Sequence, residues 1–458
     1  MKKIIPTLMA IIITTQIFAQ TENYTKAIEN FTSNYNAENY TEIFNNFAPE
    51  MKQAIPLKEA NEFLTNEKLT YGKIINTLFI EYVEGTFAIY KTTFEKEVRT
   101  IYLSLNTANK INGLAIKPYK EKIIIQKAAN FLSTYPKEIA EIIFAKTKDF
   151  PNNTQLSIAI INNNKTSYYG IIKTNDTIKV IDNKSKVFEI GSLTKVFTST
   201  VLATLVIDKK IKLNDNINTY YPFKFKDDIQ LNFKSLANHT ASLPRLPENF
   251  NPSNNANPYK DYGKKEIEDY LKNGIKLDTG KLKKYSYSNL GAGLLGHTLG
   301  LVQKTNFKKL LVTCIFNKYK MTNTFTSSQN LGNKLIKGLN SSGKKTSNWD
   351  FDVLFGGGGI LSTTQDLAKF VIAHFNTKNA ILNLTKTPTF KVNNTMQIGL
   401  GWHIIKLATG QELIWHNGGT GGYKSSTSIN LKTKKAVIIL SNLFGANTLD
   451  DLGYELIK

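Results

Sequence analysis

Two residues one helical turn apart give the first chemical signal in the sequence. Ser192 and Lys195 stand in the run Phe188–Lys195 (FEIGSLTK), directly before an apolar segment that ends near Val206. At 3.6 residues per turn, their side chains share one face of a helix. Ser192 would then lie at the helix N-terminus, where free N–H groups and the helix dipole stabilise developing negative charge. The pair predicts a serine nucleophile with a lysine partner.

A second signal is Tyr287, the only tyrosine in the chain with an asparagine, Asn289, two residues later. A phenol beside an ammonium group has its anion stabilised, so Tyr287 could act as a general base next to Lys195. The Asn289 amide could hold a substrate carbonyl group. Taken alone, the pattern favours a buried tyrosine followed by an asparagine that caps a helix.

A third signal is the glycine-rich run Trp415–Tyr423 (WHNGGTGGY), which contains the only His-x-Gly of the sequence, at His416. Apolar strand-like segments flank it on both sides. Glycines let the backbone approach a ligand closely and expose N–H groups that can bind an oxyanion. Taken alone, the run is more typical of a tight turn in a β-hairpin.

Together, the three segments resemble the serine β-lactamase and penicillin-binding-protein superfamily, in particular its class C-like branch of D,D-peptidases and esterases. That family orders its motifs as SxxK, YxN and then KTG or HxG on an edge strand. Here Ser192, Tyr287 and His416 follow one another at intervals of 95 and 129 residues, in the same order. The resemblance extends from about Asn153 to the C-terminus.

The resemblance implies a role for each residue of the motifs. Ser192 would be the acylated nucleophile, and Lys195 and Tyr287 would form the proton-transfer pair. Asn289 would bind the substrate carbonyl group. His416 would take the place of the lysine in KTG.

The resemblance also places the oxyanion hole at the N–H groups of Ser192 and Gly419. It implies no cofactor and no metal ion. The five histidines are scattered along the chain, and the single cysteine, Cys314, lies in an apolar run that favours a buried thiol.

The function implied is an exported active-site serine hydrolase that cleaves an amide or ester through an acyl-enzyme on Ser192. The substrate would be a D-amino-acid cell-wall peptide, cut by carboxypeptidase- or aminopeptidase-like activity, or a small ester. His416 lacks the fixed positive charge that a β-lactam carboxylate needs, which disfavours a dedicated β-lactamase. A β-lactamase, or a catalytically silent penicillin-binding or wall-binding protein, remains the alternative.

The pattern of elements predicts a two-domain α/β (α+β) chain. Residues 151–458 would form the β-lactamase-like domain, with a central antiparallel sheet built from strands near both of its ends, flanked by helices and carrying an inserted all-helical region. The pair Ser362 and Gln365 predicts a capping box for a helix over Thr363–Phe375. Residues 121–150 are predicted to form a helical connector.

Residues 20–120 predict a small α+β domain, with helical periods followed by four strand-like runs between Ile75 and Ile116. Its order of elements resembles the nuclear-transport-factor-like modules that accompany secreted hydrolases. It shows no converging catalytic residues, so we expect an accessory role, including oligomerisation through this domain.

The N-terminus reads as a secretory signal peptide over residues 1–19, with Lys2 and Lys3 before an apolar run that is too short to span a bilayer. No cysteine follows that run, which disfavours a lipid anchor. We therefore expect a periplasmic or secreted protein with no transmembrane segment.

The chain carries a formal net charge of +22, and 20 of these charges fall within residues 131–458. Only Arg99 and Arg245 are arginines, and the other basic residues are lysines. Sequence-specific readers of nucleic acid favour arginine, so this composition disfavours a specific nucleic-acid partner. Peptidoglycan, a peptide or a small molecule is the expected partner, and codon bias remains an alternative source of the lysine excess.

Overall fold

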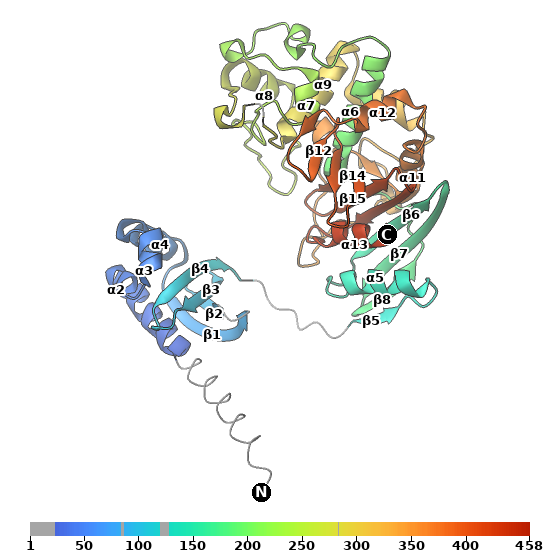
Figure 1. Cartoon of the computed structure of the whole chain (residues 1–458). Coiled ribbons are helices and arrows are strands. Elements are labelled where there is room, and N and C mark those ends of the chain that lie inside the picture. Colours follow the sequence, from blue (N-terminus) through green and yellow to red (C-terminus); the bar gives the residue numbers. More distant parts are fainter. Residues whose placement is uncertain (1–22, 84–86, 120–127, 283) are drawn as a thin grey trace. The chain divides into compact units, whose positions relative to one another are not determined.

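The computed structural model describes residues 23–83, 87–119, 128–282 and 284–458 (Figure 1). The chain divides into two compact units, unit 1 (Met1–Ile124) and unit 2 (Ile125–Lys458). The expected signal peptide, residues 1–19, lies outside the described residues. Each unit is considered by itself.

Unit 1 has its helices first and an antiparallel meander after them, as the sequence predicts. Buried aromatic and aliphatic side chains, among them Phe31, Leu64 and Leu103, join the helices to one face of the sheet. The described elements are helical residues 23–36, α2 (Tyr40–Asn45), α3 (Pro49–Ala54), α4 (Leu57–Tyr71), β1 (Ile74–Val83), β2 (Phe87–Phe94), β3 (Val98–Leu105) and β4 (Ile111–Pro118). The four strands pair in chain order.

Unit 2 is built on a sheet of ten strands among the described residues, in the order β11-β12-β13-β14-β15-β16-β6-β7-β8-β5. All pairs are antiparallel except β5 with β8. The strands are β5 (Ala129–Phe131), β6 (Gln155–Asn162), β7 (Lys165–Thr174), β8 (Thr177–Ile181), β11 (Phe390–Lys391), β12 (Met396–Ile398), β13 (His403–Lys406), β14 (Glu412–Gly419), β15 (Lys424–Asn430) and β16 (Lys435–Ser441). Because β16 lies beside β6, strands from both ends of the unit meet in one sheet, which confirms the expected fold class.

The sheet of unit 2 is buried on both faces at its centre. Successive side chains of a strand point to opposite faces. On β16, Val437 and Ile439 accordingly join one apolar cluster with α5 (Lys137–Thr147) and α13 (Leu449–Leu456). Ile438 and Leu440 join the other cluster, which contains the inserted helices. This two-sided burial explains why β16 is a continuous apolar run.

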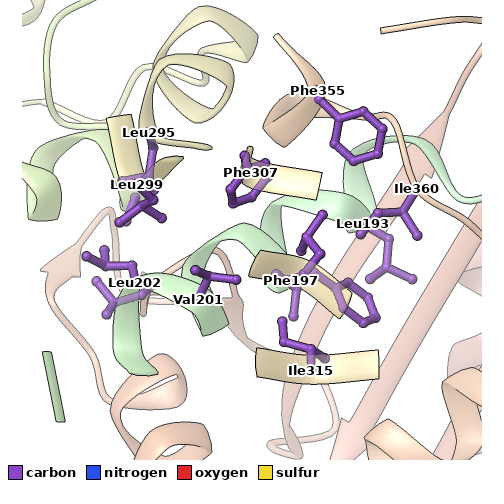
Figure 2. Close-up of a cluster of buried hydrophobic side chains, with 14 of the residues drawn as sticks. Leu193, Phe197, Val201, Leu202, Leu295, Leu299, Phe307, Ile315, Phe355 and Ile360 are labelled. Carbon is purple, nitrogen blue, oxygen red and sulfur yellow. The ribbon is translucent and has the colours of Figure 1, made fainter. Parts of the chain in front are cut away.

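The inserted helical region packs on the second face of the sheet. It includes α6 (Thr194–Ile207), α7 (Phe233–Ala237), α8 (Lys264–Asp269), α9 (Asn289–Val302), α10 (Phe307–Leu311), α11 (Thr364–Ala373) and α12 (Ala380–Lys386). Figure 2 shows the core between them, where Phe197 and Val201 of α6 lie among Leu295, Ile315 and Ile360. The apolar character of α6 on all sides reflects burial by several neighbours.

Two glycines of α9 allow another backbone segment to pass close to it. A Cβ atom on Gly293 would lie 2.8 Å from the Cα atom of Leu354, and one on Gly296 would lie 3.1 Å from the Cα atom of Gly356. Side chains at these positions would push the segment 354–357 away from α9. Gly357 is the last residue of this segment, and its carbonyl group lies in the candidate site.

Two local expectations differ from the structure. In the described part of 121–150, the chain forms β5 as well as the helix α5, and both belong to unit 2, because β5 pairs with β8 and α5 buries Ile143 under the sheet. The helix α11 begins one residue later than expected. Its N-cap is Thr363, whose side chain accepts a hydrogen bond from the Asp366 N–H, and not Ser362. Ser362 instead pairs in the strand β10 (Leu361–Ser362).

Within the residues that the structure describes, none of the helices has the length and apolar character needed to cross a membrane.

The carboxylate of Asp450, on α13, holds β14 and β15 to that helix. It accepts hydrogen bonds from Trp415 Nε1 at 3.1 Å, Asn417 Nδ2 at 2.7 Å and Ser426 Oγ at 2.6 Å. We predict that Asp450→Ala lowers the free energy of unfolding by about 2–4 kcal/mol, because hydrogen bonds to a charged group contribute about 1.5–3 kcal/mol each and their loss is partly offset by water. Urea denaturation measures the change.

The neighbouring Asp451 provides the matched control, since it is exposed in the same first turn of α13. Asp451→Ala should change the free energy of unfolding by no more than about 0.5 kcal/mol. Equal effects of the two substitutions would show that Asp450 acts only through the charge of that helix turn.

Candidate active site

Ser192 lies in a tight turn that connects the strand β9 (Phe188–Glu189) to α6. The turn is a 3-10 helix over Gly191–Leu193, so α6 itself begins two residues after Ser192. Gly191 has a φ of +52°, and a Cβ atom there would lie 2.5 Å from the Gly419 N atom. Only glycine satisfies both constraints. The turn therefore brings Ser192 against the end of β14.

Lys195 is bonded to three different segments of the chain. Its Nζ atom lies 3.0 Å from Ser192 Oγ, 2.9 Å from Asn289 Oδ1 and 2.6 Å from the carbonyl oxygen of Gly357. Three acceptors match the three donors of an ammonium group. Sequence spacing predicted the first contact, and the structure adds the other two.

Lys195 is only 2% exposed, and its environment disfavours the charged form. Burial lowers the pKa of Lys195 well below its usual value, and the charge of Arg245 lowers it further. A neutral Lys195 can keep two donated hydrogen bonds and use its lone pair to accept a proton from Ser192. The arrangement thus suits proton transfer between Ser192 and Lys195.

Tyr287 lies between Ser192 and a group of buried rings. It is hydrogen-bonded to the Ser192 side chain, and the Lys195 Nζ atom lies 4.9 Å from its ring centroid. The ring of His239 lies 4.5 Å away. Burial raises the pKa of Tyr287 to about 12, so its phenol stays protonated at neutral pH. This favours Lys195 as the acceptor of the Ser192 proton, and the division of roles within the pair stays a prediction.

Asn289 is the first residue of α9, and its amide makes two contacts. Its oxygen accepts from Lys195, and its nitrogen donates to the hydroxyl oxygen of Tyr259 at 3.2 Å. The helix is capped one residue earlier, by the side chain of Ser288. The isolated pattern favoured Asn289 as the helix cap. In the structure Ser288 is the cap, and the Asn289 side chain is bonded to Lys195.

His416 lies on β14 and is almost fully buried. Its Nδ1 atom lies 2.6 Å from the carbonyl oxygen of Asn417, so Nδ1 carries the proton and donates. Nε2 has no hydrogen-bond partner among the described residues. Burial lowers the pKa of His416 well below its usual value, and the nearby His403 and Lys195 lower it further. His416 is therefore neutral, with a free acceptor nitrogen.

A small cavity of about 20 Å³ lies beside the nucleophile. Ser192, Asn289 and Gly419 line it from three different elements, and the side chains of Tyr259 and Trp349 form an aromatic wall. This volume holds about one water molecule. The structure thus brings together Ser192, Lys195, Tyr287 and Asn289, with the end of β14 at the opposite side of the cavity.

Sequence reasoning missed three contributors to this site. The Gly357 carbonyl group and the Tyr259 hydroxyl group orient Lys195 and Asn289, and Glu189 supports the aromatic wall. Oε1 of Glu189 accepts from Asn348 Nδ2 at 2.6 Å and from the Trp349 N–H at 3.0 Å. Glu189 lies in the run Phe188–Lys195, which the sequence selects for Ser192 and Lys195. Nothing in the loop around Tyr259 signals its position.

No group of three or more histidine, cysteine, aspartate or glutamate side chains in the described part of the chain could hold a metal ion. His239 is a loop residue whose Nδ1 atom accepts the Ser288 N–H at 3.2 Å.

Comparison with known families identifies both units. A family model described as Beta-lactamase matches residues 151–458, which is more than half of the chain. The chain belongs to the β-lactamase family. A second model, described as a protein of unknown function (DUF3887), matches residues 29–114 in unit 1. The likeness of unit 1 to nuclear-transport-factor-like modules stays a prediction.

The relatives of this β-lactamase family member are distant. Beta-lactamase-like protein 4 of Dictyostelium discoideum is 29% identical over 46% of this chain and 39% of its own length. A β-lactamase of Pseudomonas fluorescens is 27% identical over 54% of this chain and 69% of its own length. Protein flp of Staphylococcus aureus strain MRSA252 is 23% identical over 63% of this chain. The chain spans 59% of that protein and well under half of the Dictyostelium protein.

Solved structures share the fold. A β-lactamase/D-alanine carboxypeptidase from Pseudomonas syringae has a TM-score of 0.59 at 19% identity and covers 70% of this chain and 97% of its own. An octameric penicillin-binding protein homologue from Pyrococcus abyssi has a TM-score of 0.57 at 20% identity, with 69% of this chain and 75% of its own covered. These comparisons establish a β-lactamase fold in a family of serine hydrolases.

Glu189 provides a test of the electrostatics behind the nucleophile. Burial raises the pKa of Glu189 from 4.5 to about 7. An acid whose pKa rises on folding binds more protons in the folded state, so the wild type loses stability as the pH rises from about 4.5 to about 7. Glu189→Gln keeps the shape and cannot ionise. We predict that the free energy of unfolding of Glu189→Gln increases relative to that of the wild type as the pH rises from about 4.5 to about 7.

Urea denaturation of both proteins at a series of pH values measures the difference. Parallel pH profiles of the wild type and the variant would contradict a raised pKa at Glu189.

Proposed function

We propose that this β-lactamase family member is an active-site serine hydrolase that cleaves an amide or ester through an acyl-enzyme on Ser192. The observation that carries the proposal is the 3.0 Å contact between the buried Lys195 Nζ atom and Ser192 Oγ. A buried amine with a lowered pKa, next to a hydroxyl group, is an activated nucleophile pair. The same Nζ atom is held in place by Asn289 and Gly357.

In the first half-reaction, neutral Lys195 accepts the proton of Ser192 while Oγ attacks the carbonyl carbon of the substrate. The N–H groups of Ser192 and Gly419 stabilise the negative oxygen that forms. The bond to the leaving group then breaks, and the leaving amine or alkoxide takes a proton from Tyr287 or Lys195. The product of this half-reaction is an ester between Ser192 and the acyl group.

In the second half-reaction, a water molecule attacks the same ester. The Lys195 and Tyr287 pair accepts a proton from that water and passes it to Ser192 Oγ as Oγ leaves the acyl group. The free acid departs and the original state of the site returns. The cavity beside Ser192 has the volume of one water molecule, which fits this step.

The neutral His416 favours substrates without a free carboxylate at this position, such as small esters and peptides cut by aminopeptidase-like activity, over β-lactams. A charged residue at this position would attract the carboxylate of a β-lactam, whereas a neutral imidazole with a free acceptor nitrogen repels it. The name of the Pseudomonas syringae neighbour includes D-alanine carboxypeptidase, which supports a D-amino-acid peptide as the first substrate to test. A catalytically silent penicillin-binding protein is the second candidate, because its site would need only the acylation half of this chemistry.

We further propose that residues 1–19 direct export, which would place the lysine-rich unit 2 beside anionic cell-wall polymers. Sequencing the N-terminus of the protein recovered from cells tests this. Assembly through unit 1 is a related proposal, and the octameric state belongs to the Pyrococcus relative.

Ser192 can be tested directly with a fluorescent fluorophosphonate or penicillin probe. We expect covalent labelling of the wild type and at least a 100-fold loss in Ser192→Ala, because the acyl-enzyme has no other nucleophile (order of magnitude from nucleophile removal). Mass spectrometry locates the adduct. Ser341→Ala provides the control, since Ser341 has the same spacing to Lys344 but lies in a loop. Equal labelling of Ser192→Ala would reject the proposal.

The proton acceptor can be assigned by comparing two variants. We expect Lys195→Ala to slow acylation by about 10³-fold, within the usual contribution of a general base, and Tyr287→Phe to slow it less. The reason is that burial lowers the pKa of Lys195 and raises that of Tyr287 to about 12. Stopped-flow acylation rates measure both effects. A larger loss in Tyr287→Phe would assign the base role to the tyrosine.

A further inference from the structure

The two arginines of the chain have different surroundings. Arg99, in unit 1, is buried, lies 3.6 Å from the carboxylate of Glu97 and stacks on the ring of Tyr71. Arg245, in unit 2, is exposed and forms no ion pair with any of the described residues. Arginine binds carboxylates through two parallel hydrogen bonds, which lysine cannot do. A free guanidinium group is thus available in unit 2.

The backbone fixes Arg245 next to the start of α9, which carries Asn289. Its carbonyl oxygen accepts the N–H groups of Asn289 at 3.0 Å and Leu290 at 3.1 Å, at the start of α9. Its guanidinium carbon lies 5.4 Å from the ring centroid of Tyr287. The side chain therefore leans over the tyrosine that is hydrogen-bonded to Ser192.

The site has two sides: the Asn289 flank, with Asn289, Tyr259 and Tyr287, and the β14 flank, with His416 and Gly419. The charge of Arg245 acts on the Asn289 flank. Burial raises the pKa of Tyr259, and the charge of Arg245 partly opposes this rise. Tyr259 is bonded to Asn289 and lines the cavity beside Ser192. The backbone bonds of Arg245 to Asn289 and Leu290, and its position over the ring of Tyr287, place it on the Asn289 flank.

The two flanks differ in what they can offer an anion. On the β14 flank, His416 is neutral and presents an acceptor nitrogen, which a carboxylate cannot use. Lys424 is a lysine on this flank, and its stem packs beside Gly419. On the Asn289 flank, the planar guanidinium group of Arg245 lies over the ring of Tyr287, and the Arg245 backbone is bonded to the start of α9. The geometry therefore suits a substrate with its negative charge on the Asn289 flank.

We propose that Arg245 is a specificity-determining residue that binds a carboxylate on the acyl part of the substrate, the part that remains attached to Ser192. This inference rests on the proposed serine hydrolase function and narrows its substrate class. Substrates with an acidic acyl chain are preferred, and substrates whose only charge lies on the leaving group are not.

Two esters with the same leaving group test this preference. In 4-nitrophenyl hydrogen glutarate the acyl chain ends in a carboxylate, and in its methyl ester the same chain is neutral. We expect the wild type to favour the anionic ester by about tenfold or more in kcat/KM, mainly through KM, as a charge-assisted pair would give. Arg245→Gln should abolish this ratio, and Arg245→Lys should retain part of it.

Lys424→Gln is the matched control, because it removes the cation on the opposite flank. We expect it to preserve the preference for the anionic acyl chain. If Arg245→Gln lowers kcat/KM equally for both esters, Arg245 acts on Tyr287 and Lys195 rather than on the substrate, and the proposal fails. A wild type without a preference for the anionic ester also overturns it.

A binding measurement separates this inference from the proposed function. The Ser192→Ala variant cannot be acylated, so calorimetry with the two intact esters reports affinity without turnover. Tighter binding of the anionic ester, lost in the Ser192→Ala/Arg245→Gln double variant, supports Arg245 even if the reaction itself has been assigned wrongly. Equal affinities would overturn the role of Arg245 while leaving the acyl-enzyme on Ser192 untouched.

Discussion

The buried side-chain nitrogen of Lys195 makes the contacts on which the site of this β-lactamase family member depends. It joins the turn before α6, the first residue of α9 and the glycine-rich segment at Gly357 through three hydrogen bonds. Removing a partner of a buried polar group is costly, because the desolvation of that group is then uncompensated. Lys195 therefore fixes the positions of these three segments relative to one another. The nucleophile is oriented by the same contacts that hold the helical region together.

Other parts of unit 2 make this arrangement possible by close backbone contact. Gly191 lets the serine turn touch the end of β14, and Gly293 and Gly296 let the segment before Gly357 pass against α9. Asp450 holds β14 and β15 to α13 on the other side of the sheet. The residues that make these contacts take no part in the proposed reaction. They fix the distances between the side chains that do.

The sequence predicts the parts of the site that obey a local spacing. Ser192 and Lys195 follow from helical periodicity, and the order of the three motifs selects Tyr287 and His416 from many tyrosines and histidines. The strands of unit 2 follow from their apolar runs. The contacts of Tyr259 and Gly357 do not, because they depend on how a loop and a backbone carbonyl group meet α9 in space. The cap at Thr363 and the short strand β5 were missed because single polar residues and three-residue strands carry almost no periodic signal.

The charge state of the site also lies beyond the sequence. Tyr287 and Lys195 have opposite pKa shifts from the same burial, which a list of residue types does not reveal. The neutral state of His416 follows from its burial and from its cationic and imidazole neighbours. The distribution of charge across the site is thus a product of tertiary structure.

The pairing of β6 with β16 determines when the sheet of unit 2 can be completed during synthesis. Ile158 lies opposite Ile439, so the centre of the sheet is completed only when the last strand has been synthesised. Sheets that depend on such distant partners fold slowly and late. The turn with Ser192 leaves the ribosome early, but the strand with Gly419 follows much later. Until β16 has formed, β6 lacks its neighbour at the centre of the sheet, and the turn with Ser192 has no completed sheet to pack against.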